Sequence, residues 1–181
     1  GDTKDALILK LRYRMIKNAF SLLMFSRGNP MFLYVYEFCD TRFGNNNPYC
    51  QDNLTSWLDW KLLDTHRDIF EFCKYMIHFR HNHPAIRKSI AQSHCGFPPI
   101  SQHGVTPWDD NFTQDSKIVC TMFAGHDEKQ DSEDIVYLAV NPYWESILIH
   151  LPKLPKPLQW HLAVDTSLSD TSGCTFEKEQ M

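Results

Sequence analysis

Apolar and polar positions follow two different repeats along this chain of 181 residues, and the change falls near residue 90. Before it, apolar side chains recur at the 3.6-residue spacing of helices over residues 5–26 and about 66–82. The polar side chains of the first segment form one thin stripe, so we expect that helix to be buried on more than one side. Gly28 and Pro30 end it, because glycine caps helices well and proline cannot continue them.

Residues 31–38 form a continuous apolar run between these two helices, without the alternation of a half-exposed strand. The length and aromatic content of this run predict a short strand covered on both faces, as in a parallel sheet. One strand of that kind cannot form a sheet by itself. The first half therefore resembles one and a half α/β units taken from a larger body.

Short apolar runs alternate with turns in the second half, which is typical of antiparallel strands. The polar, mostly acidic stretch 125–133 is expected to be a loop. This half predicts a small antiparallel β-sandwich, joined to the first half near residues 86–93. The expected strands cover residues 117–123, 134–140, 146–151 and 160–164.

Composition narrows the classes of partner. Apolar residues make up 43% of the chain and the formal net charge is -4, without a basic run or an acidic block. This is the composition of a globular protein, and we expect neither nucleic acid nor a membrane as its partner. No signal peptide is expected, because Asp2 and Thr3 lead directly into the first helix pattern.

The six cysteines are scattered and form no CxxC pair, which favours free thiols in a reducing compartment. We therefore expect a cytoplasmic protein. No glycine-rich nucleotide loop, HExxH or GxSxG occurs, so the commonest motif-based enzyme classes are not supported and no cofactor is expected. His78, His81 and His83 are close in sequence, but we interpret them as a solvated helix end rather than a metal site.

The most informative segment is an amide-rich loop, residues 44–53, followed by the aromatic stretch 56–60. Amides and carboxylates bond hydroxyl groups, and flat aromatic rings stack on the apolar faces of sugars. The alternative is an ordinary loop, with asparagines for turns and tryptophans for packing. The candidates for a substrate rim are Glu37, Asn45, Asn46, Asn47, Tyr49, Gln51, Asp52, Trp57 and Trp60.

Carboxylates near the end of the expected strand raise the question of catalysis. Glu37 and Asp40 stand where α/β barrels place active-site groups, and Asp52 and Asp59 follow in the loop. Two carboxylates flanking a glycosidic bond would suit glycoside hydrolysis. We favour a structural or rim role for all four.

These residues carry a resemblance to a known family. Residues 28–31, 36–38, 44–53 and 56–60 resemble the final barrel strand and following loop of bacterial glycogen debranching enzymes. These are isoamylase-type members of the α-amylase family of glycoside hydrolases, family 13. The remaining similar positions are those of the barrel's seventh helix (Arg14, Asn18, 22–24), the end of its eighth helix (79–80, 83–85, Arg87), and the family's C-terminal β-domain (Ser101, 103–104, Trp108, 140–141, Trp144, 151–152, 160–166).

The resemblance implies an α+β chain, with the last helix-strand-helix of a (β/α)8 TIM barrel in residues 1–88 and a C-terminal β-sandwich in 89–181. It implies a parent that hydrolyses α-1,6 branch points in glycogen or related α-glucans by a retaining mechanism. The family's three catalytic carboxylates would precede Gly1, so no residue of this chain is catalytic and the chain alone is inactive. Val35 and Tyr36 replace the family's usual Gly-Asp.

A second hypothesis is a stand-alone, non-catalytic carbohydrate-binding or interaction module. Its tryptophans would supply stacking surfaces, although Trp144 and Trp160 are expected in the core. Under the first hypothesis the apolar first helix lacks neighbours. We therefore expect either self-association or a missing N-terminal catalytic portion that covers this helix and residues 31–38.

Overall fold

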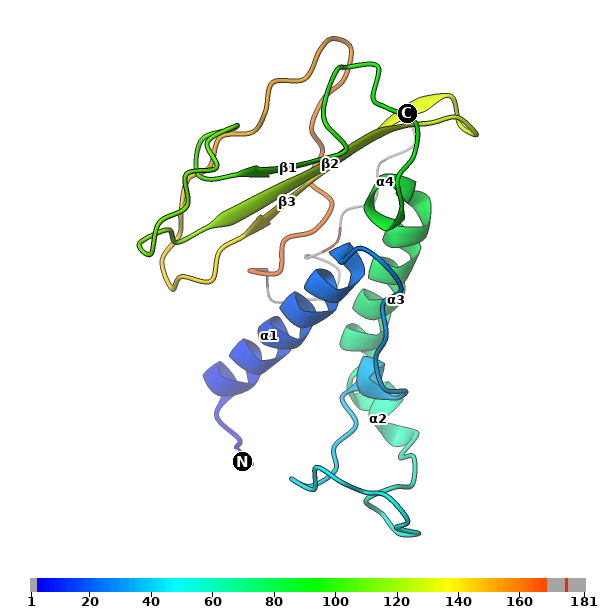
Figure 1. Ribbon diagram of the computed structural model, residues 1–181. Coiled ribbons are helices and arrows are strands. Elements are labelled where there is room, and N and C mark those ends of the chain that lie inside the picture. Colours follow the sequence, from blue (N-terminus) through cyan, green and yellow to red (C-terminus); the bar gives the residue numbers. More distant parts are fainter. Residues whose placement is uncertain (1–2, 169–174, 176–181) are drawn as a thin grey trace. The chain divides into compact units, whose positions relative to one another are not determined.

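The structure is a computed structural model that describes residues 3–168 and 175 (Figure 1). The chain divides into two compact units. The first comprises the described parts of Gly1–Met24, Pro30–His78 and Leu162–Met181, and the second comprises Phe25–Asn29 and Phe79–His161. None of the helices in the described residues combines the length and apolar character needed to cross a membrane.

The first unit contains most of two helices, α1 (Ala6–Phe25) and α3 (Arg67–Asn82), whose last residues belong to the second unit. A short helix α2 (Lys61–Thr65) precedes α3. The Asp5 carboxylate caps α1 by accepting the N–H of Leu7 at 2.8 Å. Both helices predicted from the 3.6-residue repeat are confirmed within one or two residues at each end.

The buried side chains of the first unit come from α1, from α3 and from the segment between them. Lys17 is buried with its ammonium 5.6 Å from the centre of the Phe72 ring, and Phe20 meets Phe32 edge to face at 5.6 Å. The apolar core residues are Phe20, Met24, Val35, Phe38, Ile69, Phe72, Cys73 and Met76.

The predicted strand over residues 31–38 is wrong. This segment has no regular secondary structure at its start and then forms a single 3-10 turn, η1 (Tyr36–Phe38). Val35 and Cys39, on either side, adopt left-handed backbone conformations, with φ of 70° and 62°. A strand needs a neighbour for its ladder of hydrogen bonds, and the first unit has no other strand within the described residues to supply one.

The second unit is built on one three-stranded antiparallel sheet in the order β1-β2-β3 (Figure 1). Its strands are β1 (Ile100–His103), β2 (Val119–Asp127) and β3 (Ser132–Val140). Met122 pairs with Tyr137 in the register of β2 and β3. The short helix α4 (Pro84–Arg87) packs against β2 and β3, and its Ile86 is completely buried.

The antiparallel character of the second half is confirmed, but several details differ from the prediction. β2 continues to Asp127, so the expected loop over 125–133 shrinks to the hairpin turn. β1 was not predicted, and 146–151 and 160–164 form no strands in the described part of the chain. Pro152, Pro155 and Pro157 lie between these two regions, where proline cannot donate to a ladder. The described residues thus form a small α+β protein with one sheet.

Candidate functional site

The amide-rich loop is folded on itself by hydrogen bonds from its own asparagines. The Oδ1 atom of Asn45 accepts the N–H of Asn47 at 2.9 Å, and that of Asn53 accepts the N–H of Thr55, also at 2.9 Å. Asn47 accepts from the Tyr49 N–H at 3.4 Å. These are turns of the kind that asparagine favours, so part of the amide content serves the shape of the loop.

Gln51 ties the two sides of this loop together. The amide of Asn45 donates to Gln51 Oε1 at 3.4 Å, and Gln51 Nε2 donates to the backbone carbonyl of Asn47 at 3.1 Å. The hydroxyl of Ser56 donates to the carbonyl of Gln51. The loop is therefore cross-braced before any ligand binds, which reduces the entropy lost on binding.

Arg42 is a further brace that sequence reasoning missed. Its guanidinium donates to the carbonyl of Thr55 at 2.6 Å and pairs with the Asp40 carboxylate, with Nε 3.0 Å from Oδ2. Both side chains are nearly buried. The signal in the sequence was an arginine two residues after an aspartate, just before the amide-rich loop.

The aromatic residues behave differently from the amides, because their rings remain exposed. Trp57 donates its indole N–H to Asp52 Oδ1 at 2.7 Å and is 54% exposed. Trp60 is 64% exposed and lies 6.0 Å, centre to centre, from the buried Phe38 ring. Tyr49 is 82% exposed. Rings with a fixed polar edge and an open face can stack on an apolar ligand face while neighbouring polar groups bond its hydroxyls.

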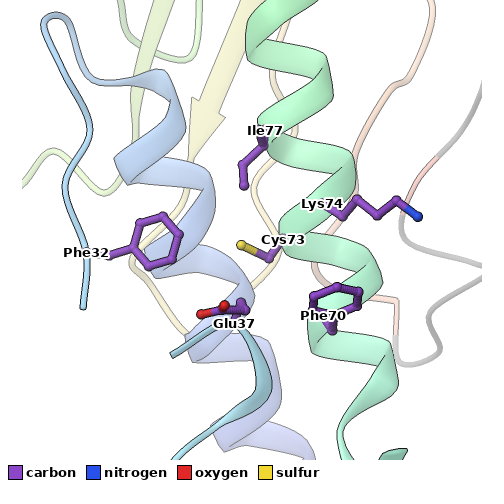
Figure 2. A pocket seen from close by; sticks show the side chains of 6 residues that line it. All are labelled: Phe32, Glu37, Phe70, Cys73, Lys74 and Ile77. Carbon is purple, nitrogen blue, oxygen red and sulfur yellow. The ribbon is translucent and has the colours of Figure 1, made fainter. Parts of the chain in front are cut away.

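Glu37 lies in a different environment, at a pocket of about 220 Å³ (Figure 2). Its Oε2 atom is buried and has no hydrogen-bond partner among the described residues. The pocket is smaller than the roughly 300–1,000 Å³ typical of small-molecule sites, so it suits a single polar group rather than a sugar ring. Its lining is Phe32, Glu37, Phe70, Cys73, Lys74 and Ile77.

Cys73 faces the same space as Glu37 in Figure 2, from α3. Burial, and secondarily the negative charge of Glu37, raise the pKa of the Cys73 thiol from 9.0 to about 12. The thiol is therefore protonated at neutral pH. Of the expected free thiols, Cys39, Cys50, Cys73, Cys95 and Cys120 are free in the structure.

The structure separates the four carboxylates considered for catalysis. Asp40 pairs with Arg42, Asp52 accepts from Trp57, and Asp59 accepts the N–H of Lys61 at 3.0 Å. Each of these three has a structural partner. Glu37 Oε2 and Asp40 Oδ2 are both buried without a hydrogen-bond partner among the described residues, but Asp40 Oδ2 has the ion pair with Arg42.

The proposed rim residues thus fall into four groups. Asn45, Asn47 and Gln51 form one hydrogen-bonded network, Asp52 and Trp57 form a second, and Glu37 lines the pocket. Asn46, Tyr49 and Trp60 are exposed. Their contact with a ligand stays a prediction.

The structure also shows the environments of Trp144, Trp160 and His83, three residues outside the loop. Trp144 is 83% exposed, so the expectation that it lies in the core is wrong, whereas Trp160 packs on Tyr137 and donates its indole N–H to Pro152 at 2.8 Å. The run after Asn141 that contains Trp144 forms no strand, so no strand register holds this side chain. His83 was expected at a solvated helix end, but its Nδ1 atom lies 2.6 Å from Asp134 Oδ1, within hydrogen-bond distance.

Comparison with known proteins finds relatives of nearly the whole chain. Isoamylase 3, chloroplastic, from Oryza sativa subsp. japonica is 32% identical over 178 residues, which cover 98% of this chain and 21% of that protein. Isoamylase 1, chloroplastic, from Arabidopsis thaliana is 31% identical over 178 residues, covering 96% of this chain and 21% of that protein. The glycogen operon protein GlgX homolog of Mycobacterium bovis is 42% identical over 88 residues, covering 49% of this chain and 12% of that protein.

No protein-family model matches the chain. The chain spans about a fifth of the length of the two isoamylases. The resemblance carried by the amide-rich loop is confirmed, because homologues that cover this chain are isoamylases and GlgX-type glycogen debranching enzymes, consistent with an isoamylase-type C-terminal portion.

Proposed function

We propose that this chain is part of a glycoside hydrolase that cleaves α-1,6 branch points in glycogen or a related α-glucan. Residues 1–88 would form the end of its TIM barrel and residues 89–181 its C-terminal β-sandwich. The support is the identity of 32% and 31% to two isoamylases across nearly the whole chain. The free thiols agree with a cytoplasmic location, which we also propose for the parent.

The observation that carries the proposal is the exposure of Trp57 on the loop that bears the resemblance. Its indole N–H is held by Asp52 at 2.7 Å, so the ring is oriented without a ligand. Trp60 and Tyr49 are exposed on the same loop. We propose that these rings stack on glucose units at the rim of the site and that the exposed amide of Asn46 bonds their hydroxyls.

We assign no catalytic residue within this chain. A retaining glycosidase needs two carboxylates about 5–5.5 Å apart on either side of the scissile bond. Asp40, Asp52 and Asp59 are each held by a structural partner. The nucleophile and the acid would then come from the rest of the parent polypeptide, and the isolated chain would hydrolyse neither glycogen nor pullulan.

The exposed face of α1 supports a larger parent. Leu7, Leu11, Met15 and Leu22 recur along this helix at helical spacing, and each is about half exposed or more. A continuous apolar stripe of this kind is normally covered. Because the chain spans about a fifth of its isoamylase relatives, we propose that the remaining barrel of the parent covers this stripe.

The alternative, a stand-alone carbohydrate-binding module, has one observation in its favour. Trp144 is 83% exposed and its ring lies 3.9 Å, centre to centre, from that of Tyr143. The pair offers a second aromatic surface, on the second unit and away from the amide-rich loop in sequence. This surface would bind glucan without any hydrolytic machinery.

Affinity electrophoresis of the 181-residue chain in gels containing glycogen distinguishes the two. Trp57→Ala and Trp60→Ala should each weaken retardation severalfold, since stacking contacts are lost, while Trp144→Ala serves as the matched control. Retardation that depends on Trp144 and not on Trp57 favours the module. Turnover of glycogen by the isolated chain that disappears in Glu37→Gln would show that Glu37 is catalytic and refute the assignment.

A further inference from the structure

Two histidines and a glutamate converge in the second unit, far from the amide-rich loop in sequence. His94, His126 and Glu133 each offer one ligand atom, and these three atoms lie within 4.8 Å of one another. The imidazole Nδ1 atoms of His126 and His94 lie 3.2 and 3.8 Å from the same oxygen, Glu133 Oε1. Neither sequence spacing nor a known motif predicted this cluster.

Backbone pairing places these residues, so their convergence does not depend on flexible side chains alone. His126 and Glu133 face each other in the register of β2 and β3. The segment before His94 joins them because the N–H of His126 donates to Ala91 at 2.9 Å. Glu133 then accepts the backbone N–H of His94 at 3.0 Å and the hydroxyl of Ser93.

The ring of His126 lies between two carboxylates. Its Nε2 atom is 3.3 Å from Asp131, while Nδ1 faces Glu133. A neutral imidazole has one N–H, so a ring that donates to Asp131 turns a lone pair on Nδ1 toward a carboxylate oxygen. A cation between Nδ1 and Oε1 removes this repulsion. A carboxylate that orients a metal-binding histidine through its other nitrogen is common in metal sites.

His94 adds a reason to prefer a metal ion to a proton. Its ring stacks on that of His126, with centres 4.0 Å apart and planes 27° apart. Two protonated imidazoles stacked in this way would repel each other, whereas one metal ion binds both as neutral rings. In a tetrahedral zinc site, with bonds of about 2.0–2.1 Å, ligand atoms lie about 3.4 Å apart, which the distances of 3.2 and 3.8 Å bracket.

The side chains that converge are two imidazoles and one carboxylate, a ligand set that zinc binds in proteins. We propose that His94, His126 and Glu133 bind one Zn²⁺ ion, with Asp131 as a positioning residue for His126. Imidazole ligands favour zinc over magnesium or calcium, and a water molecule would complete the tetrahedral set of four ligands.

The proposed ion would fasten the segment after α4 to the β2–β3 hairpin. That segment carries His94, and the hairpin carries His126 and Glu133. Zinc binding would therefore stabilise the folded second unit by mass action. This proposal does not depend on the glucan-binding function.

The test titrates the EDTA-treated, dialysed 181-residue chain with Co²⁺, which reports coordination through visible absorption, and then displaces it with Zn²⁺. We expect one equivalent of tightly bound metal and a rise in melting temperature with Zn²⁺. His94→Ala should weaken binding at least tenfold. Asp131→Asn should weaken binding about tenfold, because the charged partner that orients the His126 ring is lost.

The matched control is the double variant His78→Ala, His81→Ala, which removes two histidines outside the cluster and should bind normally. His94 is a safe site for substitution because its side chain is 72% exposed; an unchanged melting temperature in EDTA confirms that the variant folds. Absence of a stoichiometric cobalt signal would overturn the proposal. So would equal affinity in His94→Ala, or loss of binding in the control variant alone.

Discussion

The imidazole Nδ1 of His83 lies 2.6 Å from one carboxylate oxygen of Asp134, and the other oxygen accepts the Ala85 N–H at 2.8 Å. Asp134 is on β3 and is only 6% exposed, while His83 and Ala85 flank the start of α4. One carboxylate therefore joins this helix to the sheet. The residue next to it in sequence, Glu133, belongs to the proposed zinc site, so β3 anchors two segments at adjacent positions.

Loss of the Asp134 carboxylate should destabilise the second unit. Asp134→Ala leaves the buried N–H of Ala85 without its acceptor, and we expect unfolding in urea to be easier by about 2–3 kcal/mol. The control is Asp64→Ala, which breaks the exposed pair with Arg67 and should cost less than about 1 kcal/mol. Equal effects in the two variants would contradict a structural role for Asp134.

Substitution of Gly125 should destabilise the protein, because Ile90 and Ala91 lie very close to its Cα atom. A Cβ atom there would collide with Ile90 Cγ1 and lie 3.1 Å from the carbonyl oxygen of Ala91. We expect Gly125→Ala to cost about 1–3 kcal/mol by overpacking and to weaken Co²⁺ binding, since Ala91 pairs with His126. The double variant Gly125→Ala, Ile90→Ala removes the colliding side chain and should recover part of the loss. Thermal melts of Gly125→Ala, Ile90→Ala and the double variant check this; strictly additive losses of stability would count against the collision.

Val35 occupies a backbone conformation that favours glycine. It has φ of 70° yet is only 3% exposed, at the position where the resemblance leads one to expect glycine. Val35→Ala loses packing and keeps the strain, whereas Val35→Gly loses the same packing and relieves it. We expect the glycine variant to be more stable than the alanine variant by about 1 kcal/mol.

The control for this comparison is Val136, a buried residue of β3. There the alanine variant should be the more stable of the two by about 0.5–1 kcal/mol, because glycine weakens a strand. Chemical denaturation of the four variants measures both differences. The same order of stability at both positions would show that the conformation at Val35 carries no strain.

Alkaline pH should destabilise the first unit through Cys73. Its pKa is raised from 9.0 to about 12 by burial, so the folded chain holds this proton more tightly than the unfolded chain. The stabilisation is complete below pH 9 and is lost as pH rises from about 9 to 12, by at most about 1.4 kcal/mol per pH unit. Urea unfolding at several pH values should show a shallower loss for Cys73→Ala. Parallel pH profiles for the two proteins would be the contrary result.

The exposed stripe on α1 should cause the isolated chain to self-associate. Leu7 and Leu11 are 78% and 57% exposed. A contiguous apolar surface favours association when the protein segment that normally buries it is missing. Leu11→Lys should shift sedimentation toward the monomer, whereas Leu148→Lys, at an 80% exposed site on the second unit, should not. A wild-type chain that stays monomeric at tens of micromolar would contradict this expectation.

Local pattern was enough to locate α1, α3 and the pairing region of β2 and β3, because helical and strand repeats are written into neighbouring residues. It also located the amide-rich loop and the resemblance to isoamylases. Local pattern failed at residues 31–38, because an apolar run indicates that a segment is buried but does not indicate whether a partner strand exists. The same limit applies to 146–151, which has strand-like composition and no ladder.

Residues close together along the chain were enough to predict the two helices, the antiparallel second half and the family resemblance. The folded structure was needed to show that Trp57 is oriented by Asp52, that Glu37 keeps a buried unpartnered oxygen, and that His94 meets His126 and Glu133. These relationships join residues through turns and strand register. No local repeat encodes a contact between segments 32 residues apart, as His94 and His126 are, because the folded backbone alone brings them together.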